Sequence, residues 1–311
     1  MACAAWAQSP LPSWNDGNAK RAIVRFVTEV TAPGAPAFVP AEERVAVFDN
    51  DGTLWAEQPV YFQLAFMLDQ VRKAAPRHPE WKDDPGFKAV MAGDAAALAQ
   101  DHKALTKLIV AANTGMTTEA YDRAIREWLA TARHPKFDRP YTDLVYAPMV
   151  ELLAYLRDNG FKTYIVSGGG VQFMRPWVEK AYGIPPEQVV GSLVEVKLAM
   201  VEGVPVLLRE PKVAFLDDGP GKPVGIYRNI GRRPILAFGN SDGDWQMLQW
   251  TAAGSGPRLV GLVHHTDAVR EYAYDRRSKV GKLDKALDDA VAKGWTVVDM
   301  KNDWTRVFAF Q

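Results

Sequence analysis

Asp49 and Asp51 stand two positions apart, directly after the apolar run Val-Ala-Val-Phe at 45–48. A short continuous apolar run is typical of a strand that is buried on both faces. In an open parallel sheet, ligands bind beyond the carboxyl ends of the strands, so such a strand would aim both carboxylates at a binding site. Carboxylate oxygens in that position suit a hard cation such as magnesium.

Two other apolar runs also end in polar segments. The run 163–166 precedes Ser167-Gly168-Gly169-Gly170, and the run 235–238 precedes Gly239-Asn240-Ser241-Asp242-Gly243-Asp244. A Gly-rich turn between a strand and a helix favours a phosphate cradle. The acidic loop adds further oxygen ligands for a cation. The three segments together are more specific than any one of them.

The tripeptide Asn-Asp-Gly is by itself only a turn signal, and the chain contains its own control. Asn15-Asp16-Gly17 repeats the tripeptide of Asn50-Asp51-Gly52, but no apolar strand precedes it. The earlier copy therefore predicts a turn or a helix start and nothing more. The strand at 45–48 is what gives the later copy its chemical meaning.

The elements that must position these residues alternate along the chain. Apolar runs at 45–48, 163–166, 235–238 and 259–263 are predicted strands, and helical patterns separate them, for example at 149–158 and as a single helix at 172–182. A further amphipathic helix is predicted over 18–31. Strands alternating with helices predict an α/β fold with a doubly wound, Rossmann-like parallel sheet.

A different region lies between the first two strands. It holds helical patterns at 61–71, 85–91, 95–112 and 118–131 and no convincing strand. We therefore predict a helical cap over 58–143, inserted after the first strand, and a core made of 1–57 and 144–311. A small hairpin is predicted near 192–210, where two β-rich runs flank Glu202-Gly203.

The ordered motifs resemble those of the haloacid dehalogenase-like hydrolases, and among them the phosphoserine-phosphatase-like branch. The matching features are Asp49-x-Asp51-Gly-Thr, Ser167-Gly-Gly after a strand, a lysine, and the loop from Gly239 to Asp244. The resemblance covers roughly 44–57 and 144–275, is specific in the core and weak in the cap. It implies a phosphatase with a helical cap above the sheet.

The resemblance also implies roles for particular residues. Asp49 would be the nucleophile and form an aspartyl-phosphate, and Asp51 would act as general acid and then general base. Ser167 and Lys222 complete the catalytic set, and Thr53 and Gly168 would bind the phosphate. The lysine of the pattern precedes the acidic loop by 15–25 residues, which favours Lys222 over its competitor Lys212.

One divalent cation, Mg²⁺, is the cofactor that the resemblance implies. Its expected ligands are Asp49, Asp51, Asn240 and Asp244. The family pattern usually has aspartate where this chain has Asn240, so the cation would bind more weakly, or Asp242 or Asp244 would take over as ligand.

The function expected from these residues is Mg²⁺-dependent hydrolysis of a phosphomonoester, with a small phosphorylated metabolite as substrate. A phosphotransferase or phosphomutase on the same scaffold is an alternative, and so is a non-catalytic binding protein. Dehalogenation is disfavoured, because a halide leaves without the proton that Asp51 would supply. Trp55, Glu57 and Tyr61 follow the first motif and are the candidate substrate-pocket residues.

Composition limits the remaining partners. Lys plus Arg and Asp plus Glu both total 37, so the formal net charge is zero, which argues against a nucleic-acid partner. No apolar run approaches the roughly 20 residues that span a bilayer. A single cysteine excludes an internal disulfide. The oligomeric state stays open.

The first residues match either the end of a signal peptide or a short Ala-rich leader. Ala5-Trp6-Ala7 matches the small-residue end of a signal peptide, although the basic start and most of the apolar stretch are missing. A periplasmic or secreted protein is expected if this segment is a truncated signal peptide, and a cytoplasmic protein otherwise.

Overall fold

A computed structural model describes residues 10–93, 110 and 113–311. The segment Ala5-Trp6-Ala7 and nearly all of the predicted helix at 95–112 lie outside the described residues. Those two predictions therefore stay predictions.

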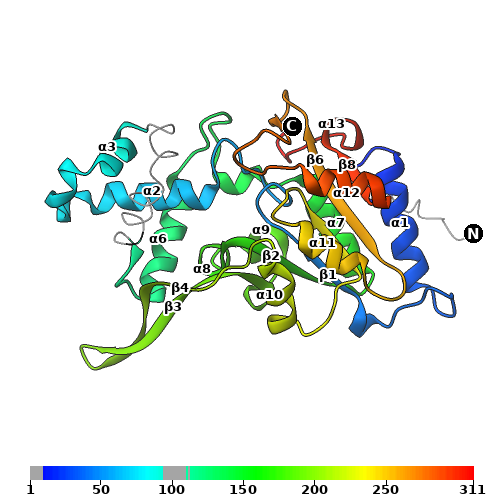
Figure 1. The fold of residues 1–311 in the computed structure, drawn as a ribbon, viewed down its shortest axis with the longest axis horizontal. Coiled ribbons are helices and arrows are strands. Elements are labelled where there is room, and N and C mark those ends of the chain that lie inside the picture. Colours follow the sequence, from blue (N-terminus) through cyan, green and yellow to red (C-terminus); the bar gives the residue numbers. More distant parts are fainter. Residues whose placement is uncertain (1–9, 94–109, 111–112) are drawn as a thin grey trace, which may run out of the picture.

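The described residues form an eight-stranded sheet in the order β4-β3-β2-β1-β5-β6-β7, with β8 beside β6 (Figure 1). The strands are β1 (Val45–Phe48), β2 (Lys162–Gly170), β3 (Val189–Val201), β4 (Val204–Phe215), β5 (Leu236–Gly239), β6 (Leu259–Thr266), β7 (Ala273–Tyr274) and β8 (Thr296–Asp299). β1 pairs in parallel with β2 on one side and with β5 on the other. The chain builds outward from β1 to β3 and then crosses over to β5, so β1 lies at the switch point of a doubly wound sheet. The predicted fold class is confirmed.

The sheet is buried on both faces, which explains the continuous apolar runs. Ala46 and Phe48 pack into a core cluster with α1 and α7, and Val45 and Val47 pack into a second cluster with α10, α11 and α12. The helices of these two layers are α1 (Asn18–Thr31), α7 (Ala147–Asp158), α10 (Gly221–Asn229), α11 (Trp245–Ala252) and α12 (Lys285–Lys293). Successive side chains of β1 point to opposite faces of the sheet, so this four-residue strand packs against the helices of both layers.

The predicted single helix at 172–182 is wrong. The structure has two short helices there, α8 (Val171–Met174) and α9 (Val178–Tyr182). Pro176 lies between them, and proline has no amide hydrogen to continue the helical ladder. The C-terminal region adds one more short helix, α13 (Met300–Asp303).

Between β1 and α7 the described residues form helices and none of the strands of the sheet. They are α2 (Phe62–Ala74), α3 (Pro85–Ala92), α6 (Thr118–Thr131) and the short 3₁₀ helices Ala75–Arg77, Pro79–Asp83 and Tyr141–Leu144. Figure 1 shows α2, α3 and α6 to one side of the sheet. Two further 3₁₀ helices, Ala41–Glu43 and Pro186–Gln188, precede β1 and β3. The division into a cap at 58–143 and a core at 1–57 and 144–311 stays a prediction.

The hairpin of β3 and β4 is longer than the predicted 192–210. The first residues of β3 pair in parallel with β2, so the strand begins in the main sheet before it leaves as a hairpin arm (Figure 1). At the tip, Glu202 and Gly203 take φ of 50° and 80°, as a tight two-residue hairpin turn requires.

None of the described helices is long and apolar enough to cross a membrane.

Candidate functional site

Asp49 is the first residue after β1, and strand pairing holds it in place. Its amide donates to the carbonyl of Phe238 on β5 at 3.0 Å, so the ladder continues to the aspartate itself. The side chain is buried and accepts a hydrogen bond from Lys222 Nζ at 2.6 Å. The switch-point strand thus delivers this carboxylate to the edge of the sheet where ligands bind.

The chain turns sharply after Asp49, and Gly52 makes the turn. It takes φ of 74°, and a Cβ there would lie 2.1 Å from Asn240 Nδ2 and 2.3 Å from Glu57 Oε1. A side chain at this position would therefore collide with both neighbours. The close approach explains why the first motif requires glycine here.

Asp51 faces the same cavity as Asp49, and an indole orients it. Trp55 Nε1 donates to Asp51 Oδ1 at 2.7 Å, while the Trp55 ring stacks on Trp177 with ring centroids 4.2 Å apart. Burial raises the pKa of Asp51 to about 6, against the lowering effect of the Trp55 hydrogen bond. A carboxyl group with this pKa can hold a proton for a leaving group near neutral pH.

Lys222, near the start of α10, links two strand ends. Its ammonium group donates to Asp49 Oδ1 at 2.6 Å, to Asp244 Oδ1 at 2.5 Å and to the carbonyl of Val166 at 2.9 Å. Burial lowers the pKa of Lys222, but the charges of Asp244 and Asp49 raise it by more, so the lysine stays charged.

The competitor Lys212 lies elsewhere. It is on the hairpin arm, where it pairs with Glu195 at 2.6 Å and its side chain is 70% exposed. The structure therefore brings Lys222, and not Lys212, to the two aspartates.

The Gly-rich segment at the end of β2 lies beside them. Pairing of β2 with β3 is irregular between Ser167 and Gly170, so the backbone there leaves the ladder. The Gly169 amide donates to Ser167 Oγ at 3.0 Å, and the Gly170 amide donates to Gln63 Oε1 of α2 at 2.7 Å. Ser167 and Gly168 line the cavity, as a phosphate cradle would.

These groups enclose a cavity of about 480 Å³ between the sheet edge, α2 and the hairpin arm. Its lining residues are Asp49, Asp51, Glu57, Tyr61, Gln63, Leu64, Met67, Ser167, Gly168, Gly169, Gly170, Ser192, Leu193, Val194, Val213, Leu216, Asp218, Lys222 and Ser241. Among the predicted substrate-pocket residues, Glu57 and Tyr61 line it, whereas Trp55 is fully buried behind Asp51.

Two predicted site residues lie one layer below the cavity. Thr53 is fully buried and donates to Asn240 Oδ1 at 3.0 Å, and Asn240 Nδ2 donates to Glu57 Oε1 at 2.7 Å. Neither Thr53 nor Asn240 is among the lining residues of the described chain. The Thr53 hydroxyl is thus directed at the acidic loop and not at the place of a phosphate.

The two aspartates of the acidic loop, Asp242 and Asp244, bind different parts of the structure. Asp244 accepts from the amides of Asn240 and Ser241 at 3.0 Å each, and its other oxygen faces Lys222. Asp242 accepts from the amides of Asp284 and Ala286 at the start of α12, so it caps a helix. Asp242 is therefore engaged away from the cavity.

The oxygen groups of the cavity suit a hard divalent cation in chemistry and in charge. Two buried carboxylates, those of Asp49 and Glu57, and the half-buried carboxylate of Asp51 line it together with the ammonium of Lys222. Burial and the charge of Asp244 raise the pKa of Asp49, although Lys222 lowers it. No three acidic or histidine side chains in the described ranges already converge as a metal's ligand set. Backbone and amide oxygens would have to complete the shell around Mg²⁺.

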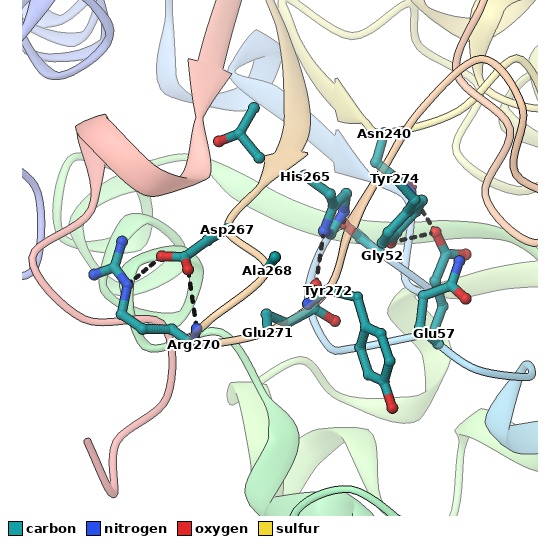
Figure 2. Close-up of polar contacts among 12 residues, drawn as sticks. Gly52, Glu57, Asn240, His265, Asp267, Ala268, Arg270, Glu271, Tyr272 and Tyr274 are labelled. Carbon is teal, nitrogen blue, oxygen red and sulfur yellow. Dashed lines mark hydrogen bonds and ion pairs between the residues drawn. The ribbon is translucent and has the colours of Figure 1, made fainter.

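Sequence reasoning missed a supporting layer under the first motif, which Figure 2 shows. His265, near the end of β6, places Nε2 2.8 Å from the Gly52 carbonyl and Nδ1 3.3 Å from Glu271 Oε2. Tyr274 donates to Glu57 Oε1 at 2.7 Å. The signal for His265 was its position after an apolar run, at the same sheet edge as Asp49.

Comparisons with known proteins agree with this geometry. A family model described as haloacid dehalogenase-like hydrolase matches residues 46–249. No match was found among curated proteins. A solved protein of unknown function from Anaerococcus prevotii DSM 20548 shares 15% identity with a TM-score of 0.54, covering 90% of this chain and 91% of that one. Another from Bordetella pertussis Tohama I shares 13% identity with a TM-score of 0.52, covering 83% and 99%.

The solved neighbours also include a phosphoserine phosphohydrolase-like protein from Francisella tularensis, at 15% identity and a TM-score of 0.41, covering 84% of this chain and 95% of that one. A likeness this distant carries no argument about substrate. The family model spans most of the chain, from β1 to α11, and includes every strand end that lines the cavity. The chain belongs to the haloacid dehalogenase-like hydrolases.

Proposed function

We propose that this protein is a Mg²⁺-dependent phosphomonoester hydrolase that acts on a small phosphorylated metabolite through Asp49. One observation carries the proposal. Asp49, Asp51, Ser167, Gly168 and Lys222 come from three separate segments of the chain and line the same cavity. They supply a nucleophile, a proton donor, a phosphate cradle and a fixed positive charge.

In the first step, a carboxylate oxygen of Asp49 attacks phosphorus, and the ester P–O bond breaks as the new P–O bond forms. Asp51 gives its proton to the departing oxygen, so the product leaves as an alcohol. Lys222 favours the ionised form of Asp49, because it donates to Oδ1 at 2.6 Å and its charge acts to lower the pKa of Asp49.

In the second step, Asp51, now a carboxylate, takes a proton from water while that water attacks the phosphorus of the aspartyl-phosphate. The bond between phosphorus and Asp49 breaks, which releases inorganic phosphate and restores both carboxyl groups. The Ser167 hydroxyl and the Gly168 amide hold the non-bridging oxygens in both steps.

Mg²⁺, when bound, supplies positive charge that offsets the repulsion between the phosphoryl oxygens and the attacking carboxylate. The residues that would hold it are Asp49, the backbone carbonyl of Asp51, and the loop of Asn240 and Asp244. The excess of buried carboxylates over ammonium groups in the cavity supports this assignment.

The wall of the cavity indicates what the leaving group looks like. Leu64 and Met67 of α2 face the cavity together with apolar residues at the base of the hairpin arm, which are Leu193, Val194, Val213 and Leu216. Within the described residues, Lys222 is the only cationic side chain of the lining, and Asp218 adds a negative one. A neutral, partly apolar alcohol fits this wall better than a carboxylate-bearing one such as serine.

A phosphate-release screen tests the proposal. Neutral alkyl and aryl phosphomonoesters would be compared with phosphoserine, with Mg²⁺ and with EDTA, on wild type, Asp49→Asn and Asp16→Asn. Asp16 is the matched control, because it lies in the same tripeptide with a side chain that is 91% exposed.

Metal-dependent phosphate release by wild type and Asp16→Asn, lost in Asp49→Asn, is the expected result. Release that persists in EDTA would overturn the cofactor assignment. Transfer of phosphate to an added alcohol without free phosphate would replace hydrolase by phosphotransferase.

A further inference from the structure

Asn240 stands where the family pattern usually has a carboxylate, and its amide is held at both ends. Oδ1 accepts from Thr53 Oγ1 at 3.0 Å, and Nδ2 donates to Glu57 Oε1 at 2.7 Å. An ionised carboxylate only accepts hydrogen bonds, so Glu57 fixes which end of the amide faces it. An aspartate at 240 would instead set two carboxylates against each other at this distance.

Glu57 is fixed in place by packing as well as by hydrogen bonds (Figure 2). It is 1% exposed, and Tyr274 donates to the same oxygen, Oε1, at 2.7 Å. Gly52 and Gly281 leave room for it, since a Cβ on either would lie 2.3 Å or 1.8 Å from Oε1. The carboxylate therefore has one defined position, at the wall of the cavity beside Asp49 and Asp51.

The partners of Glu57 in the described chain are neutral, an amide and a hydroxyl, and it forms no ion pair with any described residue. Burying an ionised carboxylate without a positive partner is costly. The side chain thus has the surroundings of an anion whose cation is supplied from outside the chain.

We propose that Glu57 supplies to the cation site the negative charge that position 240 lacks, and that Asn240 serves as a positioning residue for Glu57. This inference rests on the proposed Mg²⁺ dependence. It moves Glu57 from the substrate wall, where sequence analysis placed it, to the cation. It also explains why residue 240 is asparagine. The asparagine side chain has the shape of aspartate, but its amide can donate a hydrogen bond to Glu57.

A charge-exchange experiment tests the proposal, with direct cation binding as the readout. Mn²⁺ would be titrated into wild type, Glu57→Gln, Asn240→Asp and the double variant, with free Mn²⁺ followed by electron paramagnetic resonance. Glutamine keeps an oxygen that can accept from Asn240 and Tyr274, so the fold should persist, and circular dichroism would check it. Glu195→Gln, on the hairpin arm, is the control.

Glu57→Gln should weaken Mn²⁺ binding about ten- to a hundredfold, and adding Asn240→Asp should restore most of the loss. Asn240→Asp alone should lower the thermal stability without metal, and added Mn²⁺ should recover it. Unchanged affinity in Glu57→Gln would overturn the proposal, and so would a double variant that binds no better than Glu57→Gln.

The outcome separates this inference from the proposed function. Wild-type protein that binds Mn²⁺ through Glu57 but hydrolyses no ester would leave the inference standing and refute the phosphatase. Hydrolysis by a protein whose affinity for Mn²⁺ is the same with and without Glu57→Gln would support the phosphatase and refute the inference. Wild-type protein that binds no divalent cation would overturn both.

Discussion

Replacing Lys222 by methionine removes the one ammonium group that two buried aspartates share. Methionine has a similar length and no charge, so packing is largely kept. In the native protein Lys222 is 2% exposed and donates to Asp49 and Asp244 at 2.6 and 2.5 Å. The variant leaves both carboxylates buried without their partner.

The expected loss of stability is large because the pair is buried. Removing one partner of a buried ion pair costs about 3–5 kcal/mol, since an uncompensated charge stays inside the protein. A typical domain is stable by only about 5–15 kcal/mol, so this is a substantial part of the total. Lys222 is the group in the described part of the chain that opposes the burial and the Asp244 charge, both of which raise the pKa of Asp49, so the variant should raise that pKa further.

The sign of the pH dependence follows from that pKa. An acid whose folded pKa is raised destabilises the fold above its unfolded pKa, and the penalty shrinks as the pH falls and the folded form takes up a proton. Lys222→Met should therefore lose most stability at pH 8 and recover part of it at pH 5. Urea unfolding followed by tryptophan fluorescence, in EDTA at both pH values, measures this.

Lys212→Met is the matched control, because Lys212 is exposed and its pair with Glu195 is on the surface. Exposed pairs contribute about 0–1 kcal/mol, so this variant should unfold almost as wild type does and keep its activity. If Lys222→Met were as stable as the control at pH 8, or lost the same amount at both pH values, the buried triad would not hold the site as described.

Three further predictions concern single residues. Ser167→Ala should lower kcat/KM about a hundredfold with little change in unfolding, as expected for one donor to the phosphoryl oxygens, measured by phosphate release. Asp51→Asn should release one equivalent of p-nitrophenol from its phosphate ester and then stop, because that leaving group needs no proton but the second step needs a base; steady turnover would contradict this role. Asp217→Asn should stabilise the protein above pH 7: Asp217 is fully buried, neither carboxyl oxygen has a hydrogen-bond partner among the residues that the structure describes, and burial raises its pKa from 3.8 to about 7. At about 1.4 kcal/mol for each unit of pKa, Asp217 destabilises the folded protein by about 4 kcal/mol above pH 7 and by almost nothing near pH 4. Urea unfolding at these two pH values checks the direction, and an equal effect at both would contradict it.

The parts of the site that could be predicted from sequence are those that depend on strand ends. The run 45–48 had to be buried on both faces, and a parallel sheet brings its carboxyl end beside that of the run 163–166. Asp49 and Ser167 therefore share a cavity for reasons that are visible in the chain. The order of the motifs then selected Lys222, which the structure places against Asp49.

The contacts that set the chemistry of those residues could not be predicted. Trp55 holds Asp51, and His265 approaches the Gly52 carbonyl across 213 positions of sequence. Such contacts depend on the direction in which each side chain points, and the spacing of apolar residues along the sequence does not predict that direction. Asn240 shows the limit most clearly, since the sequence reveals an amide in place of an acid but not that Glu57 lies 2.7 Å away.

The central claim is that Asp49 carries the phosphoryl group during turnover. The most direct measurement is mass spectrometry of peptides from enzyme quenched in acid during hydrolysis, for wild type and for Asp51→Asn, in which the intermediate should accumulate. Phosphate on Asp49 in both proteins, and neither phosphate nor turnover in Asp49→Asn, is the result we predict. Phosphate on a different residue, or substantial turnover by Asp49→Asn, would contradict the account.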